Sequence, residues 1–145
     1  MLQMKVKAVT LDQGGGFLVL LADQAETKIL PIAIGPFEAQ SIALVLQGRT
    51  SPRPLTHDLL KSVCESLGGT LQKIIITNII ESTFYAELYI QYQGQELVLD
   101  SRPSDAIALA LRWRATIYMA PRLVEFTYDY QDIISGDQKK EEDLH

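Results

Sequence analysis

Hydrophobic residues in this 145-residue chain alternate with polar ones in some segments and recur at helical spacing in others. Alternation of β-branched and aromatic residues with polar ones predicts strands, whereas apolar spacing of three or four residues predicts helices. The expected strands cover residues 4–11, 17–22, 28–34, 71–80, 83–92, 96–101 and 116–119. The expected helices cover 36–47, a segment that begins at the capping residue Thr56, and 103–114, and the aromatic-rich segment 121–134 is compatible with a further helix.

Three strands followed by a helix occur twice in this order, which indicates an internal duplication. A shift of 67 residues produces nine identities over residues 4–45, among them Phe17 with Phe84 and Pro36 with Pro103. Two such units can bury the apolar faces of both helices against one sheet. The sequence therefore predicts an α+β fold with a mostly antiparallel sheet.

Composition and charge favour one soluble domain, expected over residues 1–134, followed by a flexible acidic tail over 135–145. The net charge of −5 lies at the C-terminus, because residues 125–145 hold seven acids and two bases while 1–124 hold eleven of each. No basic stripe suited to tight duplex binding is visible, although a local basic site remains compatible with nucleic acid. Without a signal sequence or an apolar run of membrane-spanning length, a cytoplasmic location is expected, with no membrane partner.

The first candidate site lies where the strand ending at Ser101 meets the following helix. Asp100 and Asp105 can offer oxygen ligands to Mg²⁺ or Mn²⁺, while Arg102 and Ser104 can hold a phosphate with the free N–H groups of the helix start. Glu38 occupies the position equivalent to Asp105 in the first repeat and is a third candidate metal ligand. Alternatively, Arg102 neutralises one of these acids, a serine caps the helix, and the first-turn acids balance the helix dipole.

The second candidate site is the linker and helix start from Arg49 to Asp58. Arg49 and Arg53 lie close together in a proline-containing segment that can clasp an anion. His57 is the only histidine outside the C-terminal tail, so proton transfer by an imidazole at neutral pH would depend on it, with Asp58 beside it. Alternatively, Asp58 compensates the helix dipole, His57 is a surface or hydrogen-bonded histidine, and the linker is simply solvated.

Four segments, in this order, resemble the bifunctional nuclease domain family: LPIAIGPFEAQSIALVLQGR, RPLTHDLL, TFYAELYI and DSRPSDAIALALR. The resemblance extends over about residues 4–121. That family consists mainly of small bacterial proteins of unassigned role, with plant members described as cleaving both DNA and RNA. Its motif positions correspond here to Glu38, Arg49, Arg53, Pro54, His57, Asp58, Asp100, Arg102, Pro103, Ser104 and Asp105.

The leading hypothesis is a metal-assisted nuclease that hydrolyses DNA and RNA with low sequence specificity. Its expected catalytic residues are His57, Asp58, Asp100 and Asp105, its phosphate-binding residues are Arg49, Arg53, Arg102 and Ser104, and its metal ligands are Asp100, Asp105 and Glu38. The alternative is a non-catalytic module that binds a small anion or organises a homo-oligomer, with the apolar Phe37 and Trp113 at a subunit interface. A homo-oligomer is expected.

Overall fold

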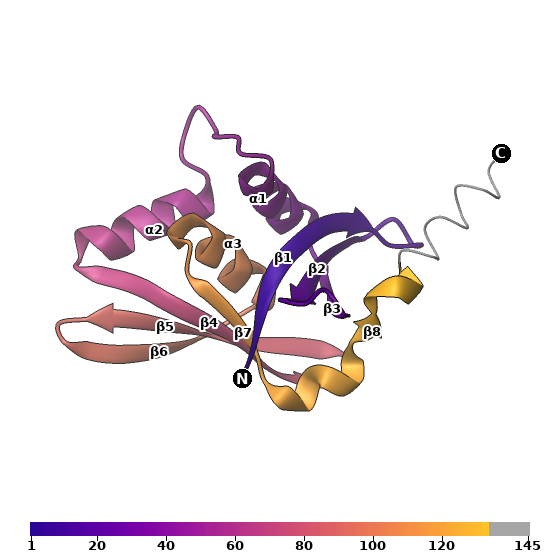
Figure 1. Cartoon of the computed structure of the whole chain (residues 1–145). Coiled ribbons are helices and arrows are strands. Elements are labelled where there is room, and N and C mark those ends of the chain that lie inside the picture. Colours follow the sequence, from indigo (N-terminus) through magenta and orange to yellow (C-terminus); the bar gives the residue numbers. More distant parts are fainter. Residues whose placement is uncertain (134–145) are drawn as a thin grey trace.

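A computed structural model describes residues 1–133 as an eight-stranded sheet with three α-helices gathered on one of its faces (Figure 1). The strands are β1 (Leu2–Leu11), β2 (Phe17–Asp23), β3 (Lys28–Ile34), β4 (Gly69–Ile80), β5 (Thr83–Tyr92), β6 (Gln95–Ser101), β7 (Thr116–Met119) and β8 (Tyr128–Asp129). The helices are α1 (Pro36–Leu46), α2 (Thr56–Ser66), α3 (Pro103–Trp113) and the short 3₁₀ helix η1 (Pro121–Phe126). The predicted α+β class is confirmed.

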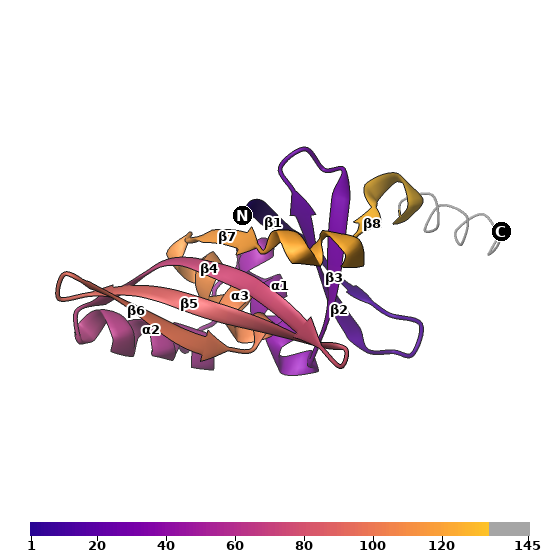
Figure 2. The same cartoon turned by 90° about the horizontal axis from the view of Figure 1, so that it is seen from below.

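The strands lie in the order β6-β5-β4-β7-β1-β2-β3-β8, and β4 with β7 is the only parallel neighbour pair among the described strands. Strand β7 therefore joins two antiparallel three-stranded halves. Figure 2 shows that the strands of the β1-β2-β3 half cross those of the β4-β5-β6 half at a steep angle. The predicted mostly antiparallel sheet is confirmed.

Strand register supports the predicted duplication. Val9 pairs with Val19 in the first unit, and the residues 67 positions later, Ile76 and Ala86, pair with each other in the second. Each unit continues through a third strand into a helix that begins with proline. The two repeats thus occupy the two halves of one sheet, on either side of β7.

The core lies between the sheet and the helices. It is built from aliphatic side chains of both halves, including the fully buried Leu21, Ile42, Ile74, Ile76 and Ile107. Helix α3 is buried more deeply than α1 or α2, because it lies against both of these helices and three strands and is buried over most of its length. Such packing fixes the first turns of α1 and α3 relative to each other.

The start of α2 differs from the prediction. Thr56 does not cap the helix, because the N-cap is Leu55 and Thr56 is the first helical residue. The Leu55 N–H donates to Asp58 Oδ2 at 2.8 Å. A carboxylate in the first turn, and not a threonine hydroxyl, therefore accepts this free N–H at the helix start.

The apolar residues of α2 are exposed rather than buried. Leu59, Leu60 and Val63 of the helix and Leu67 just after it are between 47% and 72% exposed, and His57 is the only buried residue of α2. Helix α2 lies against α3 and β4, and this leaves its apolar side open to solvent. The homo-oligomer expected from the sequence stays a prediction.

The segment after β7 is helical in parts, as was expected for residues 121–134, at residues 121–126 and 130–133. It forms η1 and then β8, which pairs with β3 through Lys28–Asp129 and Ile29–Tyr128. The expected acidic tail, residues 135–145, lies outside the described residues. Within residues 1–133, no helix is both long enough and apolar enough to cross a membrane.

Gly69, the first residue of β4, provides a test of the packing between α2 and the sheet. A Cβ at this buried position would lie 2.8 Å from Cys64 Sγ and 3.3 Å from Ile90 Cγ2. We expect Gly69→Ala to lower the free energy of unfolding by about 1–3 kcal/mol, measured by urea denaturation. A Cys64→Ala background should restore part of this loss, and an equal loss in both backgrounds would contradict this account of the contact.

Candidate active site

The first turns of all three α-helices border one pocket of about 250 Å³. Its lining is Phe37, Glu38, Gln40 and Ser41 from α1, Leu55, Thr56 and His57 at the start of α2, and Arg102 and Asp105 at the start of α3. Larger hollows, of about 410, 420 and 680 Å³, contain fewer of the predicted site residues. Since first-turn N–H groups have no intrahelical acceptor, three helix starts at one pocket favour a negatively charged ligand.

His57 connects the three helices inside this pocket. Its Nδ1 lies 2.7 Å from Ser41 Oγ on α1, and its Nε2 lies 2.9 Å from Asp105 Oδ1 on α3. The His57 side chain is 10% exposed, and both ring nitrogens contact protein groups. The geometry is that of a serine, an imidazole and a carboxylate in series.

Arg102 bridges the two acids at the pocket. Its Nε donates to Asp105 Oδ2 at 2.8 Å, and its Nη2 donates to Glu38 Oε1 at 2.9 Å. The Arg102 side chain is 66% exposed, whereas that of Glu38 is 14% exposed. Because a guanidinium carries five N–H donors, Arg102 retains donors that can reach a ligand from solvent.

Asp105 is ionised in this arrangement. Burial raises the pKa of Asp105, but hydrogen bonds from Arg102 and His57 outweigh burial, and the net pKa is lowered. An ionised carboxylate only accepts hydrogen bonds, so a neutral His57 carries its proton on Nε2 and donates it to Asp105. Nδ1 is then an acceptor, and the Ser41 hydroxyl donates to it.

Asp58 faces away from the pocket, although it is adjacent to His57 in sequence. Arg112 Nε donates to Asp58 Oδ1 at 2.6 Å, and Arg112 Nη1 donates to the Ala108 carbonyl at 3.0 Å. The Arg112 side chain is 5% exposed. Asp58 therefore neutralises a buried arginine and joins α2 to α3, instead of contributing to the group around His57.

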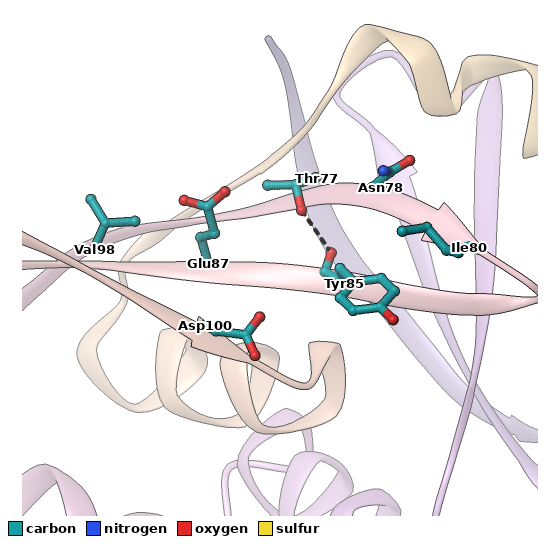
Figure 3. A pocket seen from close by; sticks show the side chains of 7 residues that line it. All are labelled: Thr77, Asn78, Ile80, Tyr85, Glu87, Val98 and Asp100. Carbon is teal, nitrogen blue, oxygen red and sulfur yellow. Dashed lines mark hydrogen bonds between the residues drawn. The ribbon is translucent and has the colours of Figure 1, made fainter.

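Asp100 and Ser104 are also separate from this group. In the strand register, Asp100 of β6 lies opposite Glu87 of β5. It borders another hollow, together with Tyr85 and Thr77 (Figure 3). Ser104 is buried and borders the hollow of about 680 Å³ beside β3. Of the residues predicted around Asp100–Asp105, the pocket thus contains Arg102 and Asp105.

Arg49 and Arg53 are exposed in the linker between α1 and α2 and do not border the pocket. Their predicted role in phosphate binding stays a prediction. Of the predicted site residues, the pocket contains Glu38, His57, Arg102 and Asp105, and these come from three separate helices.

The predicted metal ligands do not converge. Within residues 1–133, no group of three or more His, Cys, Asp or Glu side chains is arranged to hold a metal ion. Glu38 and Asp105 both accept hydrogen bonds from Arg102, and Asp100 lies at a different hollow. These donors do not fit a metal ion held by the described residues alone.

Five pocket residues were not among the predicted site residues: Phe37, Gln40, Ser41, Leu55 and Thr56. Ser41 lies within an apolar stretch of α1 and gives no motif of its own, but the 67-residue shift places it opposite Ala108. A hydroxyl where the second repeat has a buried methyl group is a signal that could have identified it. Phe37 borders the pocket and is 82% exposed, so its ring is open to solvent.

Comparison with known proteins agrees with these motifs. The model of the bifunctional nuclease domain matches residues 19–128. The chain belongs to the bifunctional nuclease domain family. An uncharacterized protein of Mycobacterium tuberculosis H37Rv is 39% identical over 118 residues, which cover 81% of this chain and 70% of that protein.

Plant relatives share the domain within longer chains. Bifunctional nuclease 1 of Oryza sativa subsp. japonica is 31% identical over 111 residues, 73% of this chain and 33% of its own length. Bifunctional nuclease 2 of Arabidopsis thaliana is 24% identical over 103 residues, 69% of this chain and 31% of its own length. The chain thus aligns with about a third of each plant protein.

The Asp58–Arg112 pair predicts a pH-dependent contribution to stability. Burial raises the pKa of Asp58, but hydrogen bonds from the Leu55 N–H and Arg112 lower it by more, so the net pKa lies below the ordinary 3.8. A lowered pKa stabilises the folded state above pH 3.8, and this stabilisation is lost as the pH falls through the folded-state pKa. Since Asp58 is 37% exposed, we expect Asp58→Asn to cost only about 1–3 kcal/mol at neutral pH.

Urea denaturation at neutral and acid pH measures this effect. The difference in the free energy of unfolding between wild type and Asp58→Asn should decrease in acid. Asp129→Asn is the matched control, because the Lys28–Asp129 pair is exposed on both sides and should contribute about 0–1 kcal/mol. Equal losses in the two variants would show that the buried arginine does not depend on Asp58.

Proposed function

We propose that the protein hydrolyses phosphodiester bonds of DNA and RNA with low sequence specificity in the pocket at the three helix starts. The observation that carries this proposal is the convergence of His57, Asp105 and Arg102 from separate helices on one pocket. Membership of the bifunctional nuclease domain family supports it, as do the names of the plant relatives.

Phosphate binding falls to Arg102 and the helix starts. The exposed guanidinium has donors beyond those given to Glu38 and Asp105, and a planar fork suits two phosphate oxygens. With neutral His57, the three charged side chains at the pocket sum to −1, which opposes a phosphate. The positive ends of three helix dipoles and the remaining Arg102 donors offset this charge, and transfer of a proton to His57 neutralises it.

Proton transfer falls to His57. Its Nε2–H is held by Asp105, which stabilises the imidazolium that forms when Nδ1 accepts a proton. The exchanging nitrogen is therefore Nδ1, the one that contacts Ser41 at 2.7 Å. The predicted assistance by Mg²⁺ or Mn²⁺ is not part of this route and stays a prediction.

Low sequence specificity follows from what lines the pocket. Arg102 and the helix starts recognise a backbone phosphate, which every nucleotide carries. Phe37 provides an exposed aromatic face beside it, and stacking on such a face tolerates any base. Because stacking requires a base that is free of its partner strand, single-stranded DNA and RNA are the favoured substrates.

The first test of this function is cleavage of labelled single-stranded DNA and RNA by the purified protein. We expect His57→Asn and Asp105→Asn each to lower kcat/KM by about 10²–10⁴-fold, because one removes the base and the other its orienting carboxylate. Glu96→Gln, which removes an exposed carboxylate from β6, should retain wild-type cleavage. Binding of single strands without any cleavage would support the non-catalytic alternative and overturn the nuclease proposal.

A second test concerns Phe37. Loss of one base-stacking contact costs about 1–3 kcal/mol, so Phe37→Ala should raise KM for single-stranded substrates by about 5–150-fold while kcat changes little. Phe126→Ala is the matched control, since Phe126 is also exposed but lies in η1 and does not border the pocket. Unchanged KM in Phe37→Ala would remove stacking from the account without affecting the role of His57.

A further inference from the structure

We propose that Ser41 is the nucleophile of this pocket and forms a covalent phosphoseryl intermediate during phosphodiester cleavage. The inference rests on the proposed nuclease function and adds to it a residue that the sequence motifs did not indicate. Ser41 borders the pocket, its Oγ lies 2.7 Å from His57 Nδ1, and His57 Nε2 lies 2.9 Å from Asp105 Oδ1. A nucleophile, a base and an orienting acid in series are the arrangement that activates a hydroxyl.

The burial of His57 directs its proton exchange to Ser41. Nε2 is held by Asp105, and the side chain is only 10% exposed, so Nδ1 is the ring nitrogen left for proton exchange. Nδ1 contacts the Ser41 hydroxyl, and Ser41, a residue that borders the pocket, is itself only 4% exposed. A base in this position acts on the serine more directly than on a water molecule in the pocket.

Packing alone does not account for the Ser41 hydroxyl. A serine inside a helix commonly returns its hydroxyl to the carbonyl four residues earlier, but the partner of Ser41 Oγ is His57 on another helix. The equivalent residue of the second repeat is Ala108, which is fully buried in α3. A helix in this position of the fold therefore packs on the sheet without a hydroxyl.

The chemical steps balance without any further reactant than water. Ser41 Oγ attacks phosphorus as its proton passes to His57 Nδ1, the bond from phosphorus to one sugar oxygen breaks, and that oxygen takes the proton from His57. Water then attacks the phosphoseryl phosphorus, its proton passes to His57, and the released Ser41 oxygen recovers that proton. The products are a phosphate monoester and a sugar hydroxyl, and the serine, histidine and aspartate return to their starting states.

Diisopropyl fluorophosphate tests the nucleophile independently of nucleic-acid cleavage, because it phosphorylates activated serines with loss of fluoride. With the full chain, we expect one adduct located at Ser41 by peptide mass spectrometry and no adduct in Ser41→Ala. His57→Asn should slow labelling by about 100-fold or more. Ser62→Ala, which changes an exposed serine of α2, should label like wild type and is the matched control.

A single-turnover reaction with internally ³²P-labelled oligonucleotide, quenched in acid, should also trap radioactive phosphate on wild-type protein. Peptide mapping of the wild type keeps the test valid even if Ser41→Ala does not fold. Cleavage with neither a Ser41 adduct nor a trapped phosphoprotein would overturn the nucleophile and leave the nuclease proposal intact. Labelling at Ser41 without cleavage of DNA or RNA would retain the activated serine and overturn the substrate.

Discussion

The hydrogen bonds of His57 are the interaction on which the arrangement of the helices depends. Helix α2 leaves its apolar residues exposed, and His57 is its only buried residue. The helix is instead joined to α1 and α3 by polar contacts, through Ser41, Asp105 and the Asp58–Arg112 pair. Since a buried polar group that loses its partner costs about 1–3 kcal/mol, the contacts that orient the imidazole also determine where α2 lies. The same few hydrogen bonds therefore fix the position of α2 and the orientation of the His57 ring.

The elements of the fold could be predicted because their signals are local. Alternation of apolar residues, Pro36 and Pro103 at the helix starts, and glycines after the helices mark boundaries that the structure confirms within one or two residues. The repeat added long-range information, since it indicated which strands form equivalent units. The parallel pairing of β4 with β7 had no such signal, because it joins segments that the repeat does not relate. The exposure of the α2 apolar face was equally hidden, since helical spacing shows that a helix has an apolar side but not whether anything covers it.

The candidate site was predictable only in part, because adjacency in sequence does not give direction. His57 and Asp58 are neighbours on a helix, where successive side chains diverge by about 100°, and one enters the pocket while the other binds Arg112. Asp100 lies in β6, which ends at Ser101, and Arg102 is the N-cap of α3, so strand alternation does not extend from one to the other. Ser41 was missed for the opposite reason, since a small polar residue in an apolar helix resembles a packing residue.

Duplication and divergence together explain why the pocket is charged as it is. The repeat places Glu38 and Asp105 at equivalent helix starts that meet at one pocket, where two carboxylates alone would repel each other. Arg102 bridges them, and its equivalent in the first repeat is Gly35, where a Cβ would meet the Glu38 carboxylate. The two equivalent acids therefore lie in an asymmetric site with one arginine. His57 comes from α2, the helix between the repeats, and it contacts the serine of one repeat and the acid of the other, so neither unit holds the complete group by itself.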